Sequence, residues 1–174
     1  MPSPTSELIM AVDIGTRCGV AFLNLGASRK SDDDLPTHIT LVEHHNLDKL
    51  QSSSGLKPIH CKYLSWKLLL EDVLDGVSTV VYEDAAFQKG RAGVVFHRLV
   101  GILMGECFKR NINIVKIPVP TIKKTFTGNH QASKEDMIMR AAELGVDVEV
   151  HDEADAIAIM YTYLCKYIWG VEDE

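Results

Sequence analysis

Three carboxylates stand at the start of an apolar stretch near the end of the chain, residues 151–159. The pattern predicts a buried helix, with Asp152 and Asp155 three positions apart and therefore on one helix face. Buried carboxylates are unfavourable unless they are paired or bind a cation. Capping of the helix N-terminus, with Asp152 as the cap, would also explain an acidic first turn. This stretch alone leaves both interpretations open.

Two further acids stand where predicted strands end. Asp13 closes an apolar run and Glu83 comes near the end of a valine-rich one. In sheets with crossover helices, functional groups gather beyond the carboxyl ends of the strands. If these strands are neighbours, the two acids face each other there, and the last helix adds Asp152 and Asp155. Four carboxylates this close repel one another unless divalent cations neutralise them.

Such a set of oxygen ligands suits Mg²⁺ or Mn²⁺. Two ions about 3.5–4 Å apart can activate water and stabilise the leaving oxygen in phosphodiester cleavage. Asp84 is excluded from this set because side chains alternate along a strand. Glu153 lies about 100° around the helix from Asp152, so it faces solvent or supports the ligands from outside. His151 either orients water or phosphate or is an ordinary surface residue.

The apolar patterns predict three strands followed by alternating helices and strands. The strands are expected over residues 8–13, 19–23, 39–43, 77–84 and 112–119, and the helices over 57–74, 93–109, 133–144 and from 151 onward. Ser133 and Asp136 fit a capping box at the start of the third helix. This order predicts an α/β fold, a mixed five-stranded sheet with helices on both faces.

Length and composition predict one domain over residues 1–174, with 46% apolar residues available for its core. No apolar run is long enough for a membrane span and no secretory signal opens the chain, so we expect a cytoplasmic protein with no membrane partner. The four cysteines are widely spaced and show no metal-ligand pattern. A disulfide framework or a zinc site is therefore not expected.

The charge is unevenly distributed along the chain. The net charge is −6, but residues 88–134 contain nine basic residues and one acid, which leaves −14 for the remainder. Such asymmetry indicates a basic surface beside an acidic site, as in a protein that binds nucleic acid. Lysines that merely solvate helix surfaces are the alternative.

Several motifs together resemble the RuvC family of Holliday junction resolvases, in the RNase H-like superfamily. They are residues 11–16 (AVDIGT), 19–21 (GVA), 81–83 (VYE) and 152–159 (DEADAIAI). Their order and spacing agree from residue 8 to about residue 163. The first motif is the less specific, since D-x-G-T also occurs in actin-like ATPases and kinases, which are far longer. The resemblance implies an RNase H-like fold, and the compact length suggests a phage or viral member.

The resemblance also implies roles for individual residues. The four metal-binding catalytic acids would be Asp13, Glu83, Asp152 and Asp155, holding two Mg²⁺ ions for which Mn²⁺ can substitute. Lys134 would contact the scissile phosphate. The expected DNA-binding residues are Phe87, Lys89, Arg91, Lys123, Lys124 and Lys134, with Phe87 as an aromatic wedge whose offset from Glu83 differs by one.

The resemblance finally implies a homodimer that uses the helix at residues 93–109 and acts on branched DNA, the four-way junction above all. Gly101 and Gly105 on that helix are four apart, a spacing that permits close helix approach. We therefore expect a metal-dependent, structure-selective endodeoxyribonuclease. The alternatives are an RNase H-like nuclease that cuts RNA, of the type that matures ribosomal RNA, and a branched-DNA-binding protein without catalysis.

Overall fold

The computed structural model describes residues 7–25, 39–49, 57–85 and 89–170. Its centre is a five-stranded sheet with the strand order β3-β2-β1-β4-β5. The strands are β1 (Leu8–Asp13), β2 (Arg17–Asn24), β3 (Ile39–Asn46), β4 (Val77–Asp84) and β5 (Asn113–Pro118). Strand β2 runs antiparallel to β1 and β3, whereas β1, β4 and β5 are parallel to one another. The expected mixed sheet is confirmed, and β1 is the neighbour of β4.

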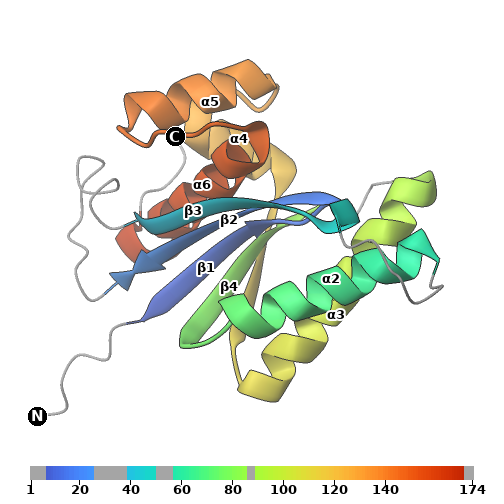
Figure 1. The fold of residues 1–174 in the computed structure, drawn as a ribbon. Helices are drawn as coiled ribbons and strands as arrows, with labels where there is room; N and C mark the ends of the chain where they lie inside the picture. The colour runs from blue at the N-terminus through green and yellow to red at the C-terminus, as the bar shows by residue number, and fades with distance from the viewer. Residues whose placement is uncertain (1–6, 26–38, 50–56, 86–88, 171–174) are drawn as a thin grey trace, which may run out of the picture.

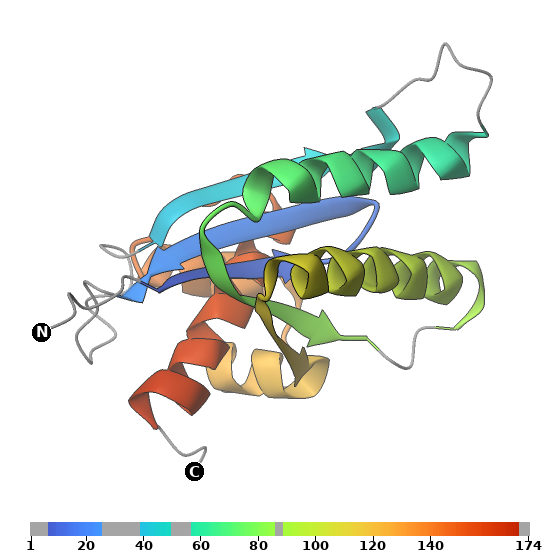
Figure 2. The ribbon, with the colours of Figure 1, turned by 90° about the horizontal axis from the view of Figure 1, so that it is seen from below.

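Helices cover both faces of the sheet (Figure 1). One face carries α2 (Pro58–Val73) and α3 (Gly90–Arg110), which lie side by side in Figure 2. The other carries α4 (Val119–Thr127), α5 (Lys134–Glu143) and α6 (His151–Tyr163). A short turn of helix, η3 (Leu47–Lys49), precedes α2, and α6 continues into the π-helix η4 (Leu164–Trp169).

The sheet separates two apolar clusters, and strand β1 supplies both. Ile9 and Ala11 pack among residues of α4, α5 and α6, whereas Met10 and Val12 pack among residues of α2 and α3. A strand buried on both faces reads as a continuous apolar run because neither face needs polar side chains. This explains the pattern at residues 8–13 and assigns each side chain of β1 to one layer.

Several expected element boundaries were wrong: β2 begins at Arg17, two residues before the expected start, and β3 ends at Asn46, three residues after the expected end. The second long helix begins at Gly90, three residues before the expected start. The last strand ends at Pro118, because Val119 and Pro120 already belong to the first turn of α4. Proline is well tolerated there, since the first-turn amides have no partner within the helix. Residues that the pattern left as a short segment therefore form a helix.

The capping box at the start of α5 is confirmed. The Ser133 hydroxyl accepts a hydrogen bond from the Asp136 amide at 3.1 Å, and the Asp136 carboxylate accepts one from the Ser133 amide at 2.8 Å. The charged hydrogen bond lowers the pKa of the Asp136 carboxyl. The start of α5 is thus defined by local contacts.

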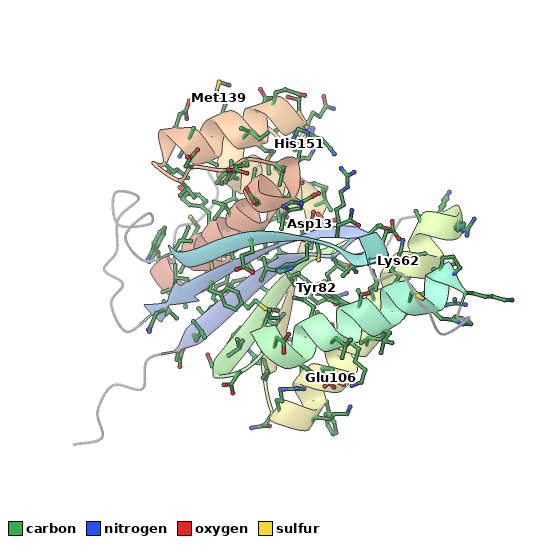
Figure 3. The ribbon with its side chains drawn as sticks, viewed as in Figure 1. Asp13, Lys62, Tyr82, Glu106, Met139 and His151 are labelled. Carbon is green, nitrogen blue, oxygen red and sulfur yellow. The ribbon has the colours of Figure 1, made fainter. Side chains whose placement is uncertain are left out.

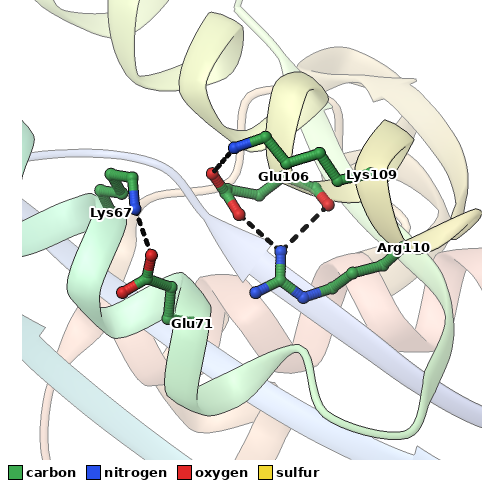
Figure 4. Close-up of polar contacts among 5 residues, drawn as sticks. All are labelled: Lys67, Glu71, Glu106, Lys109 and Arg110. Atoms are coloured by element: carbon green, nitrogen blue, oxygen red, sulfur yellow. Dashed lines mark hydrogen bonds and ion pairs between the residues drawn. The ribbon is translucent and has the colours of Figure 1, made fainter.

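Three of the nine basic residues of segment 88–134 pair with acids of this chain. Lys109 and Arg110 pair with Glu106 at the end of α3, beside the Lys67–Glu71 pair on α2 (Figure 4). Hydrogen bonds from Lys109 and Arg110 lower the pKa of Glu106 to about 2. A third cation of the segment, Lys116, pairs with Asp84 at 2.9 Å. These cations therefore neutralise acids of this same chain.

No helix in the described part of the chain combines the length and the apolar character that a membrane crossing requires. All four cysteines are buried, and none forms a disulfide with another.

Candidate active site

Asp13 and Glu83 end neighbouring parallel strands on the same face of the sheet. Val12 is the register partner of Tyr82, so each acid follows directly after that pair, and adjacent strands lie about 4.8 Å apart. Because side chains alternate, Asp13 shares the face of Ala11, on the α6 side of the sheet. Glu83 shares that face by the same alternation. The two carboxylates therefore stand side by side at one end of the sheet.

The first turn of α6 lies directly against this place. Gly19 of β2 is the register partner of Asp13, and a Cβ atom added to Gly19 would lie 1.7 Å from the backbone oxygen of Asp152. The glycine therefore permits a contact between the backbones of β2 and α6. Glycine inside a strand often marks such close approach. Residues 19–21 were part of the motif resemblance, but no positioning role was predicted for Gly19.

The four acids repel one another electrostatically. Burial raises the pKa of Asp13 well above its ordinary value, and repulsion from Glu83, Asp155 and Asp152 raises it further. Burial and Asp155 raise the pKa of Glu83 to about 7. The pKa of Asp155 is raised by burial and by Asp152. Figure 3 shows Asp13 at the end of the sheet that faces His151, the first residue of α6.

Two lysines lie close enough to act on these acids. The positive charge of Lys134, the first residue of α5, lowers the pKa values of Asp13 and Asp155. Lys123 of α4 acts in the same direction on Glu83 and Asp155. Its ammonium also donates a hydrogen bond to the Ala132 carbonyl at 2.6 Å. Lys123 thereby links α4 to the segment that leads into α5.

The neighbours of the acids have other partners. The Glu153 carboxylate accepts hydrogen bonds from the amides of Glu149 and Val150, at 2.8 and 3.4 Å. Glu153 therefore caps α6, and the interpretation of Asp152 as the cap was wrong. Asp84 pairs with Lys116, in keeping with its exclusion from the site. The Nδ1 atom of His151 is buried and has no hydrogen-bond partner among the described residues.

Lys62 of α2 holds the turn that follows Asp13. Its ammonium donates to the Thr16 hydroxyl at 2.7 Å and pairs with Asp48 at 3.2 Å. The Thr16 carbonyl also accepts a hydrogen bond from the Leu47 amide at 2.9 Å. Sequence reasoning did not identify Lys62, because its partner Thr16 lies 46 residues away and no local pattern relates them.

The remaining predicted DNA-binding residues lie at two places. Lys89 and Arg91 are exposed around the start of α3, and Lys124 is exposed on α4. Phe87, the predicted wedge, lies outside the described residues. Two groups of cations thus stand on different helices, one on each side of the sheet.

The chemistry of the donor set fits a hard divalent cation. The four groups are carboxylates, and Asp13 is buried among three others that raise its pKa. Among the described residues, no group of three or more His, Cys, Asp or Glu side chains is arranged so that it could hold a metal ion; the agreement is therefore one of ligand type. Burial, together with Asp13 and Asp152, raises the pKa of the neighbouring Cys18 thiol to about 12. In the metal-free protein, Cys18 therefore stays protonated at neutral pH.

Comparison with known proteins gives one relative in sequence and several in fold. No protein-family model matches the chain. A stretch of 82 residues is 28% identical to "Crossover junction endodeoxyribonuclease RuvC" of Anaeromyxobacter sp. (strain K), which covers 47% of this chain and 44% of that protein. The match thus spans less than half of the relative's length.

The structural likeness is more extensive. Thermus thermophilus RuvC superimposes with a TM-score of 0.67 at 16% identity, over 90% of this chain and 92% of that one. T. thermophilus RuvC in complex with a Holliday junction substrate gives 0.65 at 14% identity, with the same coverage. The resemblance to RuvC is therefore confirmed, and the chain has the RuvC fold over most of its length.

Proposed function

We propose that this chain is a divalent-metal-dependent endonuclease that cuts Holliday junctions or related branched DNA inside the cell. The observation that carries the proposal is the meeting of two strand ends with the first turn of α6. Asp13 and Glu83 lie there at the ends of adjacent strands. Gly19, the register partner of Asp13, lies against the backbone of Asp152. The RuvC fold of the chain supports the assignment.

Asp13, Glu83, Asp152 and Asp155 would hold the metal, two Mg²⁺ ions for which Mn²⁺ can substitute. When bound, such ions supply an activated water and charge stabilisation for phosphodiester hydrolysis. The protein's own contribution is to bring the four carboxylates to one place against their mutual repulsion.

Lys134 and Lys123 would act on the phosphate. Both lie within electrostatic reach of Asp155, so a phosphate bound beside the acids is also near their positive charges. Lys134 is exposed and would contact the scissile group and stabilise charge that develops on it. Lys123 is partly buried and held by Ala132. Lys124, Lys89 and Arg91 would contact the DNA backbone on either side.

A substrate panel tests the function. We expect the chain with Mg²⁺ to cut a four-way junction much faster than flaps, splayed arms, linear duplex or an RNA/DNA hybrid. Asp155→Asn should lower cutting at least 100-fold, because it removes a metal ligand, while binding of the junction remains. Preferred cutting of the hybrid would support the RNA-directed alternative, and junction binding without cutting in any metal would support the binding-only alternative.

Metal binding is expected to strengthen as the pH rises. Because burial raises the pKa of Glu83 to about 7, this carboxyl must lose a proton before it can bind a cation at lower pH. The Mn²⁺ affinity, measured by titration calorimetry, should fall by up to about tenfold per pH unit below pH ~7. Glu83→Gln should bind more weakly and lack this pH step. Equal affinities for the wild type at about pH 6 and pH 8 would contradict the assignment of Glu83.

A homodimer through α3 completes the proposal. Val94, Met104 and Phe108 expose apolar side chains on this helix, with Phe108 87% exposed. Gly101 and Gly105 leave open space on it, since a Cβ atom at either would meet nothing within 4 Å. An isologous contact of this stripe would pair two sites for cuts in two strands.

The proposed dimer is tested by measuring the molecular mass of the protein by light scattering at micromolar protein concentration. We expect the mass of a dimer for the wild type and that of a monomer for Phe108→Glu, because the substitution would place a charge in an apolar interface. Met139→Glu on α5 is the matched control, since Met139 is also exposed but lies away from α3. A monomeric wild type would refute the dimer.

A further inference from the structure

A hollow opens near the end of β1 that bears Asp13, but on the α2 and α3 side of the sheet, whereas the acids lie on the α6 side. Its wall on one side is the turn after β1, formed by Ile14, Gly15 and Thr16, and on the other it is the first half of α3. The α3 residues recur at helical spacing and are Arg91, Ala92, Val95, Phe96 and Leu99. The hollow has a volume of about 360 Å³, within the range of small-molecule sites.

The floor of this hollow is rigid and apolar. Ile14, Phe96 and Leu99 belong to the core cluster under α2 and α3 and are at most 5% exposed. The Leu99 carbonyl accepts a hydrogen bond from the indole of Trp66 at 2.9 Å, which ties this part of α3 to α2. On the opposite wall, Lys62 holds Thr16. Both walls are therefore anchored to the rest of the protein.

The charge of the hollow suits a nucleotide. Arg91 is the one charged residue of its lining and has no acidic partner among the described residues. The hollow at the other end of α3 differs, since Glu71, Asp72 and Asp75 contribute to its lining and would repel phosphate. A cation at the rim with apolar walls behind it suits a nucleotide whose phosphate meets the cation and whose base lays its flat face against apolar side chains.

The hollow lies within a few nucleotides' reach of the four acids. Gly15 follows Asp13 by two residues, so their Cα atoms are at most about 7 Å apart. A DNA strand advances about 3.4 Å per nucleotide when stacked. A base within a few nucleotides of a phosphate at the acids can therefore reach the hollow.

We propose that this hollow binds one unstacked nucleobase of the strand that is cut, with Arg91 on the adjoining phosphate. The proposal rests on the proposed function and adds to it a source of selectivity. Extracting a base from intact duplex costs unstacking and unpairing free energy, and that cost is smallest where bases are already unpaired. At the branch point of a junction the continuous base stack of the duplex is interrupted, so extracting a base costs less there, and the hollow favours branched over linear DNA.

Single abasic nucleotides test the proposal. Junctions are prepared with one abasic position at a time around the cut, and single-turnover cutting is measured with Mg²⁺. For the wild type, one position should lower the rate or the affinity by about tenfold, the size of a lost stacking contact. Ala92→Phe fills the hollow at an exposed helical position and should cut the intact junction about tenfold more slowly, with no further loss at that abasic position.

Ala142→Phe is the control, because Ala142 is an exposed helical alanine on α5. It should keep the abasic sensitivity of the wild type. Circular dichroism and junction binding in an Asp155→Asn background verify folding and separate binding from cutting. If Ala92→Phe keeps the full abasic sensitivity, or if no abasic position affects the wild type, the nucleobase site is refuted while the nuclease stands. Failure of the wild type to cut any intact branched DNA overturns both.

Discussion

Replacing Asp13 by asparagine is expected to abolish cutting and, at the same time, to stabilise the metal-free protein. Asp13 lies at the centre of the four acids, where burial and three other carboxylates raise its pKa. A buried carboxylate with a raised pKa costs folding free energy when it is ionised. Asparagine has nearly the same shape without the charge, so the substitution removes both the repulsion and a metal ligand.

The sign of the stability effect follows from proton binding. The folded protein holds the Asp13 proton more tightly than the unfolded chain does. Unfolding is therefore hardest below the ordinary pKa of aspartate, and stability falls as the pH rises toward the folded pKa. Glu83, with its pKa raised to about 7, acts in the same direction. Near neutral pH, Asp13→Asn should raise the free energy of unfolding by about 1–3 kcal/mol in the absence of metal.

Chemical denaturation in EDTA and single-turnover cutting in Mg²⁺ measure the two effects. Cutting should fall at least 1,000-fold, whereas the wild type should gain stability from added Mg²⁺ and the variant much less. Asp84→Asn is the matched control, because Asp84 ends the same strand as Glu83 but pairs with Lys116. It should keep cutting and gain no stability. A variant Asp13→Asn that is less stable than the wild type would contradict the electrostatic argument.

The strand-end acids could be predicted from sequence because their signals are local. Central parallel strands read as apolar runs, and Asp13 and Glu83 interrupt such runs at their ends. That β1 and β4 are neighbours was only a condition of the sequence argument, and the parallel pairing of the two strands now fulfils it. The capping box of α5 was equally local, since Ser133 and Asp136 are three residues apart.

Contacts between distant segments could not be predicted in the same way. Both Asp152 and Glu153 are suitable caps by residue type, and only the direction of the chain before α6 assigns the cap to Glu153. Lys62 meets Thr16 through the packing of α2 against the sheet. Helix α4 was missed because Pro118 and Pro120 suggested an interruption, although proline also begins helices.

Gly19→Ala is the second substitution for which we expect a large effect. The added methyl group would lie 1.7 Å from the Asp152 carbonyl oxygen and 2.9 Å from the Glu153 amide nitrogen. Both are backbone atoms, so no side-chain rotation relieves the overlap, and the first turn of α6 must move away from β2. Overpacking of this kind costs about 1–3 kcal/mol of stability. The movement also separates Asp152 from Asp13, and a shift of about 1 Å in an active site can cost about 100-fold in rate.

The measurement must distinguish this displacement from general instability. Cutting by Gly19→Ala is therefore compared with the wild type at a temperature where circular dichroism shows both to be folded, and Mn²⁺ affinity is measured alongside. We expect cutting to fall about 100-fold and Mn²⁺ to bind more weakly, because the metal ligands no longer converge. Ala142→Val adds methyl groups at an exposed position of α5 and should leave both quantities unchanged. Normal cutting by folded Gly19→Ala would mean that the position of Asp152 against β2 does not matter to the chemistry, and the four-acid site would then have to be reassigned.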